Sequence, residues 1–201
     1  MHDLLVATTN LHKLEEYRAI FSDLPYRLLS LRDIWLDMDV EETGTTFAEN
    51  AELKARSYAQ ASGLLTLADD SGLEIDALGG APGVYSARFA GKDTSYEERF
   101  HLILERLKGL PTEQRGARFR CVIAIAEPSG ATRLVEGVIE GVIADAPRGE
   151  RGFGYDPIFL VPEIGMTTAE LTAEDKNRIS HRGRAAQLAR VLLENWPHSS
   201  E

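Results

Sequence analysis

The sequence predicts a mixed α/β fold in which a central sheet is flanked by helices and two lobes leave a ligand cleft between them. Three observations lead to it. Short apolar runs alternate with segments of helical periodicity, two long strands follow each other in the second half, and glycines with Pro82 interrupt regular structure over residues 79–91. At 201 residues we expect one domain, 1–201, built of two lobes. The cleft between lobes is the expected active site.

The first half of the chain alternates strands and helices. Residues 4–7 form a short apolar run typical of a buried strand, and a helix follows the polar turn 8–10, with apolar residues at helical spacing: Leu14, Tyr17, Phe21 and Leu24. Thr46 and Glu49 form a capping box for a second helix, which ends near Gly63. Its predicted apolar face is Phe47, Ala51, Tyr58 and Ala61. Two strands, 64–68 and 73–77, then flank a turn at residues 69–72.

The second half contains a hairpin and two or three helices. Ser95 and Glu98 cap a helix that carries Phe100, Ile103, Leu104 and Leu107. A long strand with alternating Phe119, Cys121, Ile123 and Ile125 is joined to residues 133–143 by a turn at Ser129 and Gly130. A glycine-rich loop covers 147–157, a short strand 159–161, and Thr167 with Glu170 form another capping box. Ser180 caps a final helix whose inward residues are Leu188, Val191 and Leu192.

The overall charge excludes one class of function. The chain has 22 basic and 32 acidic residues, a net charge of −10, whereas nucleic-acid grooves and anionic membrane surfaces require a surplus of Lys and Arg. Cys121 is the only cysteine, which excludes an internal disulfide and suits a reducing compartment. No signal peptide or membrane-spanning run is evident, so we expect a cytoplasmic protein with no nucleic-acid or membrane partner.

Acidic residues gather in two loop segments, 41–44 and 69–72. Carboxylate oxygens are the ligands that Mg²⁺ prefers, and an open magnesium site leaves positions for water and phosphate. The alternative is that both pairs are solvated turn residues. Glu49 is assigned first to helix capping, with support of the metal site as a second interpretation.

Two further segments could bind a ligand. Residues 8–13 open a helix, where free N–H groups and the helix dipole favour a phosphate, although Lys13 could equally face solvent. Residues 149–156 place Phe153 and Tyr155 between glycines, where a base could stack or where the rings could plug the core. The densest cationic stretch is Lys176, Arg178, His181, Arg182 and Arg184, which could bind oxygens or form an ordinary charged helix surface.

Together these motifs resemble the inosine/xanthosine triphosphate pyrophosphatase family over nearly the whole chain. The matching segments are Ala-Thr-Thr-Asn at 7–10 with Lys13, Glu-Glu-Thr-Gly-Thr-Thr-Phe at 41–47 with 49–51 and 54–55, Leu-Ala-Asp-Asp-Ser-Gly-Leu at 67–73, 77–88, Gly-Phe-Gly-Tyr-Asp-Pro-Ile-Phe at 152–159, and 176–177 with 179–183. The main departures are Thr9 and His12, where relatives often carry glycine.

The resemblance implies an elongated two-lobed α/β fold, a homodimer and Mg²⁺-dependent cleavage of non-standard purine nucleoside triphosphates (ITP, dITP, XTP, dXTP) to the monophosphate and pyrophosphate. By matching position, Asp70 is the general base and a magnesium ligand, Glu41 is its metal partner, and Glu42 and Asp69 are possible further metal ligands. The implied substrate residues are Thr8, Thr9, Asn10, Leu11, His12, Lys13, Ser71, Phe153, Gly154, Tyr155, Asp156, Lys176, His181 and Arg182.

Base selectivity would follow from the purine 6-position, because hypoxanthine and xanthine present a carbonyl acceptor where adenine presents an amino donor. Two other functions are compatible with the same motifs. A nucleotide sensor would keep the pocket without turnover, and a related enzyme would act on modified pyrimidine nucleotides. A substrate panel with and without Mg²⁺ separates the three.

Overall fold

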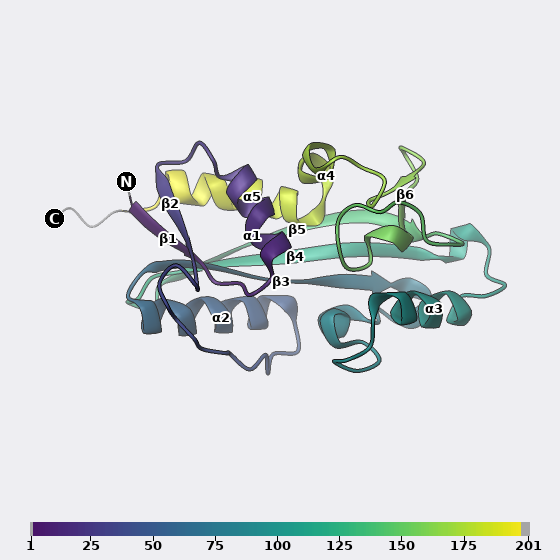
Figure 1. The fold of residues 1–201 in the computed structure, drawn as a ribbon, viewed down its shortest axis with the longest axis horizontal. Coiled ribbons are helices and arrows are strands. Elements are labelled where there is room, and N and C mark those ends of the chain that lie inside the picture. Colours follow the sequence, from purple (N-terminus) through teal and green to yellow (C-terminus); the bar gives the residue numbers. More distant parts are fainter. Residues whose placement is uncertain (1, 198–201) are drawn as a thin grey trace. The chain divides into compact units, whose positions relative to one another are not determined.

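The computed structural model, which describes residues 2–197, contains a seven-stranded mixed sheet flanked by helices (Figure 1). The strands are β1 (His2–Val6), β2 (Tyr26–Ser30), β3 (Leu65–Ile75), β4 (Gly116–Ala126), β5 (Thr132–Ile143), β6 (Phe159–Val161) and β7 (Met166–Thr167). The strand order is β2-β1-β3-β4-β5-β6-β7. Strand β1 is parallel to both β2 and β3, whereas β6 is antiparallel to β5 and β7. The predicted mixed α/β class is confirmed.

The helices are α1 (Leu11–Ile20), α2 (Phe47–Ser62), α3 (Tyr96–Arg106), α4 (Ala173–Ile179) and α5 (His181–Glu194). The two predicted capping boxes at the starts of α2 and α3 are confirmed: the Thr46 hydroxyl accepts the Glu49 N–H, and the Ser95 hydroxyl accepts the Glu98 N–H. In each box the glutamate side chain accepts the N–H of the capping residue in return. Free N–H groups of the first turn are thereby satisfied.

The chain divides into two compact units. The first unit joins the N-terminal segment up to Asp70 with Cys121–Gly137 and the C-terminal segment from Arg182. In it, α1 and α5 lie on one face of the sheet and α2 lies on the other (Figure 1). The core beneath α1 and α5 combines aromatic, aliphatic and small residues: Leu4, Val6, Leu14, Tyr17, Phe21, Leu24, Tyr26, Leu67, Cys121, Ile123, Ile125, Ala185, Ala186, Ala189, Leu193 and Trp196.

The second unit comprises Ser71–Arg120 and Val138–His181. Its core joins α3 to the strands and to the loop that precedes β6, through Leu73, Ile75, Phe100, Ile103, Leu107, Ala117, Phe119, Ile139, Ile143, Tyr155, Ile158, Phe159 and Val161. Gly141 in β5 is required by close packing, because a Cβ there would lie 2.5 Å from the Leu160 carbonyl oxygen and 2.7 Å from the Phe159 ring. The second unit therefore has a core of its own.

The predicted turn at residues 69–72 is wrong, because β3 runs without interruption from Leu65 to Ile75. Asp, Ser and Gly are turn formers largely because their side chains hydrogen-bond to nearby backbone or tolerate unusual backbone angles. Here Asp69 and Asp70 are buried and bonded to other elements instead, so the backbone stays extended.

The predicted inward face of the last helix is wrong for two of its three residues, whereas the third, Leu192, is partly buried and packs against the core of the first unit. Leu188 and Val191 are 49% and 56% exposed, whereas the buried residues of α5 include Ala185, Ala186 and Ala189. Small side chains let this helix approach the sheet closely, and that contact decides its rotation. Ala61 in α2 is likewise exposed.

The predicted capping box of Thr167 and Glu170 does not start a helix. Thr167 ends β7, and its N–H donates to the Glu170 carboxylate at 2.7 Å to close a turn. Helix α4 begins at Ala173, three residues after Glu170, and is capped by Thr172, whose hydroxyl accepts the Asp175 N–H.

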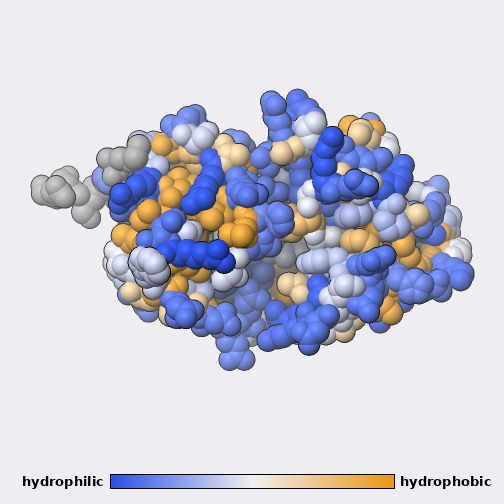
Figure 2. All heavy atoms as spheres, in the orientation of Figure 1, coloured by the Kyte–Doolittle hydropathy of each residue, from blue (hydrophilic) through white to orange (hydrophobic). Residues whose placement is uncertain are grey.

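Hydrophilic side chains cover most of the face seen in Figure 2, with hydrophobic ones showing between them. This agrees with a charged fraction of 27% and a net charge of −10. Among residues 2–197, none of the helices has the length and apolar character that crossing a membrane requires.

The rotation of α5 predicts opposite responses to two substitutions. Ala186→Leu should destabilise the protein by about 1–3 kcal/mol, because it inserts a large side chain into a packed interface. Leu188→Gln should change the free energy of unfolding by less than about 0.5 kcal/mol, as expected of an exposed position. Urea denaturation of both variants measures the difference, and a larger loss for Leu188→Gln would contradict this packing.

Candidate functional site

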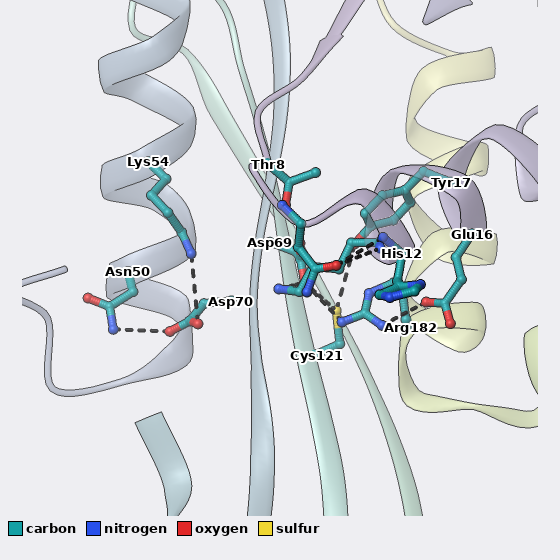
Figure 3. Close-up of polar contacts among 12 residues, drawn as sticks. Thr8, His12, Glu16, Tyr17, Asn50, Lys54, Asp69, Asp70, Cys121 and Arg182 are labelled. Carbon is teal, nitrogen blue, oxygen red and sulfur yellow. Dashed lines mark hydrogen bonds and ion pairs between the residues drawn. The ribbon is translucent and has the colours of Figure 1, made fainter. Parts of the chain in front are cut away.

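Two adjacent aspartates on β3 point to opposite faces of the sheet. Successive side chains of a strand alternate between faces, so Asp69 and Asp70 cannot share one environment. Figure 3 shows Asp70 beside the polar residues of α2, and Asp69 on the other side near Arg182 and Cys121. The carboxyl groups belong to different layers of the first unit.

Asp70 is held by a buried asparagine. Its side chain is only 9% exposed, and the Asn50 Nδ2 group donates to its Oδ2 at 3.0 Å. The Oδ1 atom of Asn50, which is fully buried, accepts the Gly44 N–H at 2.8 Å. A Cβ at position 44 would lie 2.6 Å from this Oδ1, so glycine lets the acidic loop approach. One side chain thus ties loop 41–44 to Asp70.

A lysine one helical turn beyond Asn50 completes this face. The Lys54 ammonium lies 2.6 Å from the Glu42 carboxylate and 3.8 Å from Asp70 Oδ1. Burial lowers the pKa of Lys54, but Asp70, Asp69 and Glu42 outweigh it and raise the pKa overall. Burial raises the pKa of Asp70, with Lys54 opposing and Glu42 reinforcing the change. Asp70 is therefore a stronger base than an ordinary aspartate.

The oxygen donors on this face fit a hard cation. Asp70 and Glu42 both contact Lys54, and Glu41 precedes Glu42 as an exposed residue. Among residues 2–197, no group of three or more His, Cys, Asp or Glu side chains forms a metal cage. Mg²⁺ does not need one, since one or two carboxylates suffice when substrate phosphates and water complete its coordination.

Asp69 is engaged by cations on the opposite face. Its Oδ2 accepts from Lys13 of α1 at 2.8 Å and lies 3.4 Å from the Arg182 guanidinium of α5. Arg182 also bonds to Glu16 at 2.7 Å, and its side chain is 2% exposed. Burial opposes ionisation of Asp69, but Lys13 and Arg182 outweigh it and hold its pKa well below the usual range. Asp69 is thus a buried ion-pair partner.

The predicted phosphate segment, residues 8–13, caps α1. The Asn10 side chain accepts the N–H groups of His12 and Lys13 at 3.0 and 3.3 Å, and its own N–H donates to Thr8 Oγ1. Thr9, Leu11 and His12 are exposed. Two of the donors expected to be open for phosphate are therefore already bound by Asn10.

The second unit holds the predicted base-binding residues around Asp156, which is 2% exposed. Its Oδ2 accepts from Lys176 Nζ at 2.6 Å and from the Phe153 N–H at 2.8 Å, while Oδ1 accepts from the Thr168 hydroxyl at 2.8 Å. The Lys176 ammonium also lies 4.7 Å from the centre of the Phe153 ring. Gly152, at φ +75°, has no room for a Cβ beside the Asp156 carboxylate.

The remaining predicted residues of the second unit differ in exposure. Tyr155 is buried in the core, Gly154 follows Phe153 at φ +65°, and Ser71 is half-buried in β3. His181 stacks on Phe119 with ring centres 4.7 Å apart and is 6% exposed. The sequence leaves two interpretations for the aromatic rings of residues 149–156, stacking on a base and filling the core. Tyr155 fills the core, whereas Phe153 is half-buried.

Several residues of the site were not predicted as such. Asn50 is a polar residue on the buried stripe of α2, and that break in an apolar face was the available signal. Lys54 is one of only five lysines and lies beside the acidic loop, but the sequence alone assigns it no role. Glu16 lies on a helix with no pattern to single it out. Thr168 and Ser86 contact the site only through tertiary structure.

Comparison with known proteins identifies the family of this chain. The family model described as the Ham1 family matches residues 4–191. This chain belongs to the Ham1 family. Among curated Ham1 relatives, the dITP/XTP pyrophosphatase of Bacillus subtilis is 48% identical over 96% of this chain and 98% of its own length. That of Geobacter sulfurreducens is 52% identical, over 96% and 97%.

A solved Ham1 structure supports the same assignment. The HAM1 protein from Coxiella burnetii matches with a TM-score of 0.89 and 45% identity, over 97% of this chain and all of the other. The family resemblance predicted from the motifs is confirmed.

The opposite environments of the two aspartates predict opposite effects on stability. Asp69→Asn should cost about 3 kcal/mol at pH 7, because it leaves buried cations without their anion. Since the folded-state pKa of Asp69 is lowered, its contribution is present above about pH 4 and is lost as pH falls further, so the difference from wild type should shrink there.

Asp70→Asn should instead stabilise the protein by about 1 kcal/mol at pH 7, as often found when a strained functional group is neutralised. A raised folded-state pKa means that ionised Asp70 costs stability above its unfolded pKa. Denaturant titrations from pH 3 to 7 measure both effects; equal losses for the two variants would contradict the assignment.

Proposed function

We propose that this chain hydrolyses the non-standard purine nucleoside triphosphates ITP, dITP, XTP and dXTP to the nucleoside monophosphate and pyrophosphate. The observation that carries the proposal is Asp70, a buried carboxylate of raised pKa held between Asn50 and Lys54. The names of the relatives, dITP/XTP pyrophosphatase, support the substrate class. Such an enzyme clears these nucleotides before they are incorporated into DNA or RNA.

Asp70 acts as the general base. The Asn50 donor occupies its Oδ2 and fixes the carboxylate plane, so the Oδ1 side takes the proton from the attacking water. In the absence of a bound cation, burial raises the pKa of this carboxyl. Lys54 stands 3.8 Å from Oδ1, where its charge stabilises negative charge that develops on the phosphate. No covalent nucleophile is required.

A magnesium ion fits the acidic face described above. Asp70 and Glu41 would hold it. Glu42, which forms an ion pair with Lys54 in this structure, would be a further ligand. When bound, Mg²⁺ supplies neutralisation of charge on the phosphate oxygens. Asp69 would assist from the opposite face by holding Lys13 and Arg182 in place.

The first unit takes the triphosphate with Thr8, Thr9, Asn10, Leu11, His12 and Lys13. Lys13 is 16% exposed and pairs with Asp69, so its ammonium is already oriented before phosphate arrives. Thr9 and His12, which stand where relatives often carry glycine, are both exposed. Orientation in advance lowers the entropy lost on binding.

The second unit takes the base with Ser71, Phe153, Gly154, Asp156, Lys176 and His181, and Tyr155 anchors the loop 153–156 in the core of that unit. Arg182, the last residue of the proposed set, belongs to the first unit. Phe153 offers a ring face, and the Lys176 ammonium beside it is a donor for a 6-carbonyl oxygen. Adenine would present an amino group to the same donor, and an unpaired buried donor is costly. Asp156 keeps Lys176 fixed at 2.6 Å, which makes the discrimination sharp.

The remaining features favour a free nucleotide as partner. A net charge of −10 opposes nucleic acid but not a nucleotide that arrives with Mg²⁺. The family resemblance supports a homodimer, and the single cysteine suits the cytoplasm.

The purified protein with Mg²⁺ should release pyrophosphate from dITP and XTP at least about 100-fold faster, in kcat/KM, than from dATP, the range expected when a site's donor is left unpaired. A coupled pyrophosphate assay across purine and pyrimidine triphosphates measures this, with EDTA as the metal-free control. Equal rates on dITP and dATP, or preference for a pyrimidine, would overturn the proposed selectivity, and binding without turnover would indicate a sensor.

Asp70→Asn should lower kcat for dITP by about 10²–10⁴-fold, the usual contribution of a general base. Because the amide is isosteric, nucleotide binding measured by calorimetry should persist. Asp37→Asn, at an exposed aspartate, is the matched control and should keep wild-type kcat. Substantial turnover by Asp70→Asn would remove Asp70 from this role.

A further inference from the structure

The segment Gly83–Arg88 is a 3-10 turn of the second unit to which the catalytic scheme gives no role. Within it Ser86 is buried, at 6% exposure. The Ser86 hydroxyl donates to the Gly83 carbonyl at 2.6 Å and accepts the N–H of Leu73 at 2.9 Å. Leu73 belongs to β3 and lies two residues after Ser71. The Ser86 side chain therefore fixes this part of β3.

The main chain of the same serine holds the base-binding loop. The Tyr155 hydroxyl donates to the Ser86 carbonyl oxygen at 2.9 Å. Tyr155 is 3% exposed, and Tyr96 packs against its ring edge-on with centres 5.3 Å apart. Burial raises the pKa of Tyr155, so its hydroxyl stays protonated and keeps donating. A hydroxyl committed in this way does not contact substrate.

We propose that Ser86 is a positioning residue for base recognition. Its hydroxyl fixes the position of β3 next to Ser71, and its carbonyl oxygen fixes the position of Tyr155 next to Gly154. The proposal rests on the proposed function, in which Ser71 and the loop 153–156 contact the nucleotide. Tyr155 then acts as an anchor for its loop, and its ring does not contact the base.

The physical reason is that these hydrogen bonds cannot be replaced by water. Leu73 is fully buried, so without Ser86 Oγ its N–H loses its partner and the backbone must shift to find another. Recognition of a single carbonyl oxygen depends on donors held within fractions of an ångström. Loss of either hydrogen bond therefore weakens substrate binding and base selectivity more than it slows the chemical step at Asp70.

Kinetics test this directly. Ser86→Ala should raise KM for dITP about tenfold while lowering kcat less than about twofold, and should reduce the dITP-to-dATP ratio of kcat/KM. Tyr155→Phe should act in the same direction, and the double variant should lose less than the product of the single losses because both act through one residue. Ser86→Cys, which keeps a weak donor and acceptor, should recover part of the loss.

Ser129→Ala is the matched control, since Ser129 is an exposed hairpin serine whose hydroxyl bonds Glu127. It should leave KM and selectivity unchanged. Unchanged KM and selectivity in both Ser86→Ala and Tyr155→Phe, or fully multiplicative losses in the double variant, would overturn the proposal.

Hydrogen exchange tests the tie without relying on activity. In Tyr155→Phe, the amides of residues 71–75 should exchange faster although the hydrogen bond that is lost ends on the Ser86 carbonyl oxygen, while β1 should exchange as in wild type. Unchanged exchange at 71–75 would overturn the positioning role. If the wild-type protein hydrolyses neither dITP nor XTP, the proposed function fails, and this measurement still decides whether Ser86 couples the two segments.

Discussion

Burial of two neighbouring carboxylates in one strand is the constraint on which the first unit depends. A buried carboxylate needs cations or hydrogen-bond donors, and the alternation of β3 sends Asp69 and Asp70 to opposite faces. Each helix layer must therefore supply partners for one of them: Lys13 and Arg182 come from α1 and α5, and α2 supplies the donors for Asp70. The Asn50 side chain that bonds to Asp70 also ties the acidic loop 41–44 to the strand.

The two faces of the sheet compensate the charge of their buried carboxylate to different extents. This difference distinguishes the structural role of Asp69 from the chemical role proposed for Asp70. Asp69 is overcompensated by cations, which lowers its pKa and makes it a fixed anion. Asp70 has a neutral amide donor at 3.0 Å and a lysine only at 3.8 Å, so burial prevails and raises its pKa. An undercompensated carboxylate costs stability but gains basicity, which is the usual relation between strain and function.

The second unit follows the same rule with short-range partners. The Asp156 carboxylate is satisfied by Lys176, a main-chain N–H and the Thr168 hydroxyl, and Gly152 leaves the space this requires. Because Lys176, the Phe153 N–H and the Thr168 hydroxyl all donate to one carboxylate, the loop and the lysine are held in one arrangement. A site that must distinguish one carbonyl oxygen from one amino group depends on such fixed donors.

Local signals in the sequence were enough to determine the α/β class, the capping boxes at Thr46 and Ser95, and the family. They failed where tertiary contacts override local preference. The Asp-Asp-Ser-Gly segment has turn propensity, yet it forms a strand because ion pairs from distant helices hold both aspartates. The rotation of α5, with Leu188 exposed and Ala186 buried, follows from close packing that no periodicity reveals. The family resemblance by itself already implied that Asp70 is the base. Only the tertiary structure explains why the pKa of Asp70 is raised while that of Asp69 is lowered, because a pKa depends on which charges lie nearby in space.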